Sequence, residues 1–311
     1  TGVTRTYTYD ASGNVASMTD FNGSVTTHTY DLARNLETRR VEASGTPAAR
    51  TITTEWHATL RLPLRVAEPL KRTTYTYDSQ GNVLTRTEQA TTDASGALGF
   101  GAALAGTPRV WTWTYNTYGQ PLSMDGPRTD VADLTTYTYY GATDPAVGKR
   151  GNLATVTNAL GHVTQLTAYD ANGMPLTIVD PNGLTTQLSY DPRGRLTAKV
   201  VGTEATSYTY DAAGQLTRVT LPDGSHLAYA YDAAHRLTAV SDNLGNSITY
   251  TLDNAGNRLA EQMRDPGAQI ARLKHRVFDG LSRLTEELGA QNQNLAQYAY
   301  DAQGNLTGIT E

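Results

Sequence analysis

The chain has 311 residues, 39% of them hydrophobic, with a formal net charge of −5 and no cysteine. This apolar share is low for a globular chain, so a thick core covered on both sides is not expected. The acidic balance argues against nucleic acid as a partner, and the lack of cysteine excludes disulfides and thiolate metal sites. No apolar stretch approaches the roughly 18 residues that a membrane-spanning helix needs.

A short motif, Tyr-x-Tyr-Asp, recurs along the whole chain. Seventeen of the 19 tyrosines stand in its two tyrosine positions, and some units place another residue there, as at Trp56, Leu252 and Phe278. From Tyr169 onward the motif returns about every 21 residues. A fixed short period indicates an array of similar units stacked on their neighbours. We therefore predict about thirteen units over residues 1–311, with no domain boundary, and interpret the chain as a piece of a longer protein.

Three interruptions of the period are expected in the first half of the chain. Residues 90–109 are rich in glycine and alanine and are predicted to form a flexible insertion at a turn. Shorter breaks are expected at residues 125–130 and 141–145. All three fall between units, where loops are tolerated.

Residues 208–231 illustrate the predicted unit. The alternation from Tyr208 to Tyr210 is typical of a strand. Asp211 and Gly214 favour a type I turn that ends in a left-handed glycine and a bulge. The pair Asp223-Gly224 predicts a two-residue hairpin at the other end of the returning strand. Each unit is therefore a β-hairpin.

These loop lengths predict how side chains meet across the strands. Tyr210 is expected opposite Leu216, and Tyr208 opposite Arg218, with arginine lying over tyrosine rings. The tyrosines of all units then share one face of the sheet, while small polar residues such as Thr209 occupy the other.

Two positions late in the chain depart from the pattern. His235 stands where other units have the turn glycine, so a strained or altered turn is expected. Residues 264–277 fit either a short helix or a distorted strand.

The repeat count predicts an all-β chain of roughly 26 antiparallel strands. Open twisted sheets rarely exceed about 10 strands without curling, so we expect a long curled or spiral sheet. A propeller with four strands in each blade is the alternative, since two units make one blade.

No cluster of residues with catalytic or metal-binding spacing stands out. The recurring Tyr–Asp pairs are interpreted as strand and turn residues, because a hairpin array needs one pair in each unit. Gly99-Phe100-Gly101 lacks the third glycine of a dinucleotide loop. We predict no catalytic residue, no cofactor-binding residue and no metal site. Structural roles are also expected for the histidines (His28, His57, His162, His226, His235 and His275), and a solvated face, with an anionic contact as the alternative, for the basic cluster (Arg264, Arg272, Lys274, His275 and Arg276).

The segments from Tyr75 to Leu84 and from Gly214 to Thr220 carry the pattern Tyr-x-Tyr-Asp-x-x-Gly-Asn-Val-Leu and Gly-x-Leu-Thr-x-Val-Thr. This pattern resembles the YD-repeat, or Rhs, family, and its bacterial branch in particular. The resemblance covers nearly the whole chain. It implies a segment of a hollow β-shell that encloses a toxic C-terminal domain, as in polymorphic toxins and insecticidal toxin complexes. Teneurin adhesion receptors carry a similar shell.

The resemblance further implies a secreted or extracellular protein whose partners are the remaining shell repeats and a toxin or effector domain. Family members that release their cargo carry a self-cleaving aspartate segment of the form Asp-Pro-x-Gly. We expect none here, and hence a non-enzymatic wall. The alternative function is a carbohydrate-binding, cell-surface-binding or adhesion module with cell-surface glycans as partners.

Overall fold

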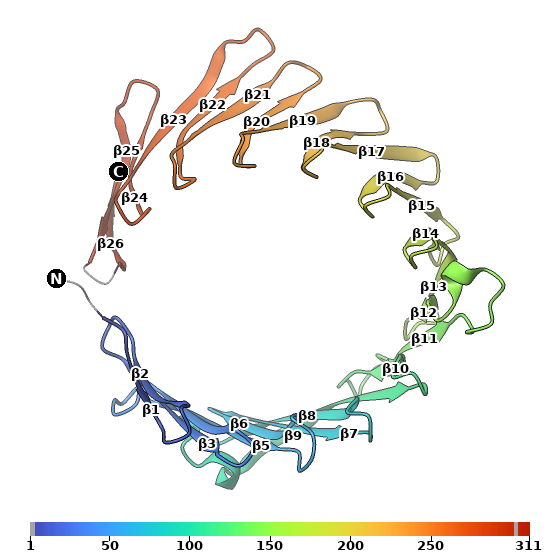
Figure 1. Cartoon of the computed structure of the whole chain (residues 1–311), viewed down its shortest axis with the longest axis vertical. Helices are drawn as coiled ribbons and strands as arrows, with labels where there is room; N and C mark the ends of the chain where they lie inside the picture. Colours follow the sequence, from blue (N-terminus) through green and yellow to red (C-terminus); the bar gives the residue numbers. More distant parts are fainter. Residues whose placement is uncertain (1–3, 302–303) are drawn as a thin grey trace. The chain divides into compact units, whose positions relative to one another are not determined.

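A computed structural model describes residues 4–301 and 304–311 of the chain. The described residues form 26 strands and two short 3-10 turns, in agreement with the predicted all-β hairpin array. Successive strands are antiparallel neighbours wherever a register is recorded, and Figure 1 shows the hairpins following one another in chain order.

The strands are short, and turns separate most of them. Their bounds are β1 Thr6–Tyr9, β2 Val15–Thr19, β3 Val25–Asp31, β4 Leu36–Glu42, β5 Arg50–Trp56, β6 Pro63–Glu68, β7 Lys71–Tyr77, β8 Val83–Thr91, β9 Leu104–Tyr115, β10 Pro121–Asp125, β11 Thr135–Tyr139, β12 Leu153–Thr157, β13 Val163–Tyr169, β14 Pro175–Val179, β15 Thr185–Tyr190, β16 Leu196–Val201, β17 Glu204–Tyr210, β18 Leu216–Thr220, β19 His226–Tyr231, β20 Leu237–Asp242, β21 Ser247–Leu252, β22 Arg258–Arg264, β23 Ile270–Phe278, β24 Leu284–Leu288, β25 Asn294–Tyr300 and β26 Leu306–Thr310. The 3-10 turns are η1 Gly99–Gly101 and η2 Val147–Lys149.

The chain divides into two compact units. The first contains the described residues up to 144 together with residues 150–165. The second contains residues 145–149 and the described residues from 166 onward. The hairpin architecture is the same within each unit.

The register of the hairpins differs from the predicted one by a second bulge, which lies in the returning strand beyond the one predicted at the turn glycine. Tyr210 lies opposite Leu216 as expected, but Tyr208 pairs with Val219 and Arg218 pairs with Thr209. The register shifts between Thr209 and Tyr210, and the same shift directly precedes the second tyrosine in other units. A bulge places two residues opposite one and moves the following side chains to the other face. The predicted pairing of Tyr208 with Arg218 is therefore wrong, and Val219 lies opposite the first tyrosine instead.

The second turn of the unit is also of a different type from the one predicted. The N–H of Gly224 donates to the Leu221 carbonyl at 3.0 Å, and the N–H of Leu221 donates to the Ser225 carbonyl at 2.8 Å. Gly224 has φ +83°, the value expected of a glycine that closes a type I turn with a bulge. Both ends of the hairpin thus use the same turn, because leucine and proline before Asp223 suit a type I turn.

The two late departures from the pattern keep the hairpin. His235 adopts φ +64°, and its N–H donates to the Asp232 carbonyl at 2.9 Å, as the turn glycine does elsewhere. The turn is therefore unchanged, and the residue occupies a backbone region that disfavours side chains. Between residues 264 and 277, β23 extends from Ile270, so the strand alternative is correct.

The two faces of the sheet differ as predicted. In β17, Tyr208 and Tyr210 are half-buried, whereas Thr209 between them is exposed. Hydroxyl groups pair across strands on the exposed face, for example Thr76 with Thr85 at 2.7 Å. Few side chains are fully buried, as expected of a sheet one layer deep.

A second layer covers the sheet at one place. The predicted insertion at 90–109 is shorter than expected, because its ends lie in β8 and β9 and only residues 92–103 leave the sheet. The connecting residues contact β5 and β6: the N–H of Thr51 donates to the Ser95 carbonyl at 2.8 Å, and Arg65 lies 4.6 Å from the Phe100 ring. These contacts favour an ordered cover over β5, near which η1 lies in Figure 1.

Candidate functional site

The aspartate of each motif holds its turn together. The Asp78 carboxylate accepts the N–H groups of Gln80 and Asn82, both at 2.9 Å, through one oxygen. Its other oxygen accepts the Asn82 side-chain amide at 2.8 Å. The Asn82 amide, followed by the turn N–H groups, holds the pKa of Asp78 below its usual range. The lowered pKa keeps the carboxylate charged, which suits a hydrogen-bond acceptor in the turn and not a group that transfers protons.

Several turns replace that asparagine with arginine, which links one unit to the next. Arg195 donates from Nε to Asp191 at 2.7 Å and lies 4.6 Å from the Tyr210 ring of the following unit. Arg236 makes the same bond to Asp232 at 2.8 Å, and its Nη1 reaches the next unit by donating to the Asp253 carbonyl at 2.6 Å. The hydrogen bonds from Arg195 lower the pKa of Asp191. Arginine suits this role because its planar group binds a carboxylate and stacks on an aromatic ring at once.

The second tyrosine of the motif also bonds the preceding unit. The Tyr210 hydroxyl donates to the Leu196 carbonyl at 2.9 Å, and the Tyr231 hydroxyl donates to the Leu216 carbonyl at 3.0 Å. The same bond is made by Tyr77, Tyr115, Tyr139 and Tyr300. Trp56 replaces it with its indole N–H, which donates to the Glu37 carbonyl at 2.7 Å. The sequence predicted that these tyrosines pair with side chains on adjacent strands, but the hydrogen bond from the hydroxyl was not predicted. The preference for tyrosine over phenylalanine at this position was the available signal.

The histidines occupy separate sites in the sheet and its turns. His28 contacts Glu37 at 2.5 Å, His226 contacts Arg218 at 2.9 Å, and His235 contacts Gln215 at 2.9 Å. Within residues 4–301 and 304–311, no group of three or more potential metal ligands is found. None of the helical segments described is long and apolar enough to cross a bilayer.

The basic cluster is not simply a solvated face. Lys274 and Arg276 contact Glu287 at 2.8 and 3.0 Å, and their side chains are only 18% and 20% exposed. The hydrogen bond from Lys274, more than any other interaction, holds the pKa of Glu287 below its usual value. The sequence showed the cations but not their cross-strand partner, which lies on the next strand.

The expectation that no Asp-Pro-x-Gly stretch occurs is wrong, since residues 180–183 and 191–194 have this pattern. Both stretches form ordinary hairpin turns. The Asp180 carboxylate accepts the N–H groups of Asn182 and Leu184 at 2.8 Å, and Asp191 is paired with Arg195 as described above. Turn formation therefore accounts for both patterns.

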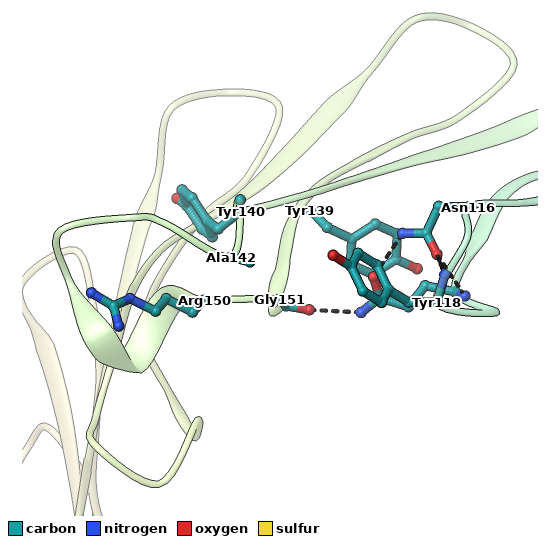
Figure 2. A pocket seen from close by; sticks show the side chains of 9 residues that line it. Asn116, Tyr118, Tyr139, Tyr140, Ala142, Arg150 and Gly151 are labelled. Carbon is teal, nitrogen blue, oxygen red and sulfur yellow. Dashed lines mark hydrogen bonds between the residues drawn. The ribbon is translucent and has the colours of Figure 1, made fainter.

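A cavity of about 520 Å³ lies within the first unit, beside the turn after β9 and the segment after β11. Figure 2 shows Tyr118 and Tyr140 at separate places around it, with Arg150 near Tyr140. The Gln120 side chain donates to the Gly151 carbonyl at 2.7 Å and ties the two segments together. Neither tyrosine belongs to a regular position of the repeat, and sequence reasoning did not single them out.

Comparison with known protein families finds RHS repeats in this chain. The RHS repeat profile matches residues 1–25, 9–47, 169–206, 201–226 and 231–270. A comparison with curated protein sequences finds no match.

Solved structures with a similar fold come from toxin complexes. The TcdB2–TccC3 complex is 16% identical with a TM-score of 0.72 and matches 98% of this chain, and the TcdB2–TccC3–Cdc42 complex is 16% identical with a TM-score of 0.69 and matches 99%. The Tc holotoxin pore of Photorhabdus luminescens is 15% identical, with a TM-score of 0.57 and 97% of this chain matched. This chain spans only 18–19% of the length of those chains.

Proposed function

We propose that this chain, which is built of RHS repeats, forms part of the wall of a hollow β-shell that encloses a toxin or effector domain of the same polypeptide. The observation that carries the proposal is the fold similarity to TccC3-containing toxin complexes over 98% of the chain. The repeat profile supports a structural role of the same type. By the same reasoning, the protein functions outside the cell that makes it.

The hairpins are suited to such a wall. A shell requires a sheet that is stable without a deep core, and here the bonds between adjacent units supply that stability. The Tyr210 hydroxyl and the Arg195 guanidinium each connect one unit to the next. Each such bond is modest, about 1 kcal/mol, but it recurs along the array.

The enclosure is tested with the full-length polypeptide. Limited proteolysis of the native protein should leave the enclosed domain intact, and the domain should become sensitive once the shell is opened by denaturant. Electron microscopy of the same preparation should show density inside the shell. A cargo domain that is digested as quickly in the native protein as when expressed alone would contradict the proposal.

The wall has no catalytic role in this proposal. Asp211→Asn should leave the fold intact, because asparagine also suits the first turn position. If the full-length protein has an enzymatic activity that this substitution abolishes without loss of melting temperature, the structural role of the motif is wrong.

Carbohydrate binding or adhesion is the second candidate function. The cavity beside Tyr118, Tyr140 and Arg150 favours it, since these residues lie outside the two tyrosine positions of the repeated motif.

A further inference from the structure

The cavity beside β9 and β11 is lined by the two tyrosines that depart from the repeat. All other tyrosines occupy the two regular positions of the motif. Tyr118 lies in the turn after β9, where other units have a small or polar residue such as Ser12, Gln80 or Ala213. Tyr140 directly follows the second tyrosine of its unit, Tyr139, and so takes the place of the turn aspartate. Two independent departures from the motif thus meet at one cavity.

Hydrogen bonds of the main chain and of the Asn116 side chain close these turns. In the first turn, Asn116 replaces aspartate and accepts the N–H groups of Tyr118 and Gln120 at 2.9 and 3.1 Å. In the second, the Tyr140 N–H donates to the Asn152 carbonyl at 2.9 Å, and its carbonyl accepts the Gly151 N–H at 3.0 Å. The Tyr118 side chain is 78% exposed, so burial does not explain it either.

The cavity combines three tyrosine rings, those of Tyr118, Tyr139 and Tyr140, with one cation. Arg150 donates from Nε to the Asp144 carbonyl at 2.7 Å, which holds the guanidinium in place. Figure 2 shows the guanidinium on the same side as the Tyr140 ring, with the Gly151–Gln120 bridge between them and Tyr118. The volume of about 520 Å³ is in the range of small-ligand sites.

We propose that this cavity binds a saccharide that carries a carboxylate group. A tyrosine ring has a flat apolar face and a polar edge, which matches a pyranose with its C–H face and hydroxyl rim. A guanidinium binds a carboxylate through two parallel hydrogen bonds. A nucleotide is less suitable, because phosphate sites use several N–H donors or cations, and Arg150 is the single cation among the described residues that line the cavity.

The proposal rests on the second candidate function and concerns a site separate from the tyrosine hydroxyl bonds and turn carboxylates of the wall. Isothermal titration of the chain with a tetramer of galacturonic acid tests it directly. The methyl ester of the same tetramer, which lacks the charge, is the matched ligand control. We expect the acid to bind and the ester to bind about tenfold more weakly or worse.

The variants are Tyr118→Ala and Arg150→Gln, and each should weaken binding of the acid by about tenfold or more. Arg150→Gln should also remove the preference for the acid over the ester. Matched controls are Tyr9→Ala, at a tyrosine that is 62% exposed elsewhere, and Arg272→Gln, at an exposed arginine on β23. Neither control should change the affinity.

Three results would overturn the proposal. The first is a wild-type chain that binds neither tetramer. The second is binding that Tyr118→Ala and Arg150→Gln leave unchanged while circular dichroism shows a native sheet. The third is binding of ATP, tested as a competing probe, that is tighter than binding of the acid and is lost in the same two variants.

Discussion

The segment from β4 to β9 and the repeats from β15 to β22 are built from the same hairpin but are stabilised differently. Between residues 185 and 264, none of the described residues is buried. Most of the buried residues lie in the earlier segment, namely Leu36, Thr51, Ala67, Thr73, Thr91, Asp93, Gly96, Gly99 and Ala102.

The difference comes from residues 92–103, which cover β5 and β6. In that segment the stability depends on close packing, so a small change in side-chain volume lowers the free energy of unfolding. In the regular repeats it depends on turn carboxylates, tyrosine hydroxyls and arginines that reach the next unit. A single layer can therefore be extended indefinitely by adding units, whereas the covered segment occurs once.

The largest contrast is expected from the same substitution in the two regions. Gly96→Ala would place a Cβ 2.1 Å from the Thr51 carbonyl oxygen, at φ +75°. Gly214→Ala, at φ +100°, would meet only the Arg195 Nη1 at 3.5 Å. We expect losses of roughly 3 kcal/mol or more and about 1–2 kcal/mol respectively, measured by denaturant unfolding. Equal losses would show that the cover does not pack as described.

The second contrast lies within one regular strand. Tyr210→Ala removes a half-buried ring, its bond to Leu196 and its stacking with Arg195. Thr209→Ala removes a hydroxyl from the exposed face. We expect a loss of about 2–3 kcal/mol for the first, somewhat below that of a core aromatic, and under about 0.5 kcal/mol for the second. Similar shifts in melting temperature for the two variants would contradict the assignment of the faces.

The regular repeats were predictable from sequence, because strand, turn and period agree in every unit. The number of strands, the tyrosine face and the pairing of Tyr210 with Leu216 all follow from that agreement. The bulge was not predictable from loop length, since it adds one residue without changing the turn chemistry. Arg218 consequently lies on the opposite face from the one expected.

The covered segment and the cavity were not predictable in the same way. A glycine-rich stretch predicts a flexible loop. Here, however, Gly96 and Gly99 are needed because residues 92–103 pack closely against Thr51 and Thr53. The Tyr118 cavity requires two segments 22 residues apart to be adjacent, a contact that no local pattern encodes. The off-register positions of its tyrosines were the one available signal.

The buried turn aspartate, Asp93, should make the stability of the covered segment depend on pH. Burial by itself raises the pKa of Asp93, but hydrogen bonds from the Leu98 N–H, the Ser95 hydroxyl and the N–H groups of Ser95 and Gly96 outweigh it and hold that pKa below its usual range. The native state therefore gains stability from the charged form above about pH 4 and loses it as the pH falls through the lowered pKa. Asp93→Asn should lower the melting temperature most at pH 7, and the difference from wild type should shrink toward pH 3. A difference that is constant with pH would contradict this charge effect.

His235→Gly should stabilise a regular repeat. His235 has φ +64° in a position where Gly214 and Gly256 adopt φ +100° and +92°. Glycine relieves about 1 kcal/mol of backbone strain there, although loss of the contact with Gln215 offsets part of the gain. The expected result is a rise in the free energy of unfolding of several tenths of a kcal/mol. His235→Ala removes the same contact but keeps the Cβ, so its free energy of unfolding should not rise.

A similarly small effect tests whether the tyrosine hydroxyl links the units. Phe278 occupies the second aromatic position but has no hydroxyl, whereas Tyr300 in the next unit donates to the Leu284 carbonyl at 2.8 Å. Leu284 is the register partner of Phe278, and Arg258 is the register partner of Leu252 one unit earlier.

In Phe278→Tyr the new hydroxyl should therefore reach the Arg258 carbonyl. The expected gain is about 0.5–1 kcal/mol, the usual net value of one hydrogen bond, measured by urea unfolding. Tyr300→Phe should lose a similar amount and serves as the matched reverse change. If both variants unfold at the wild-type midpoint, the hydroxyl contributes nothing, and the stacked rings alone must connect the regular repeats.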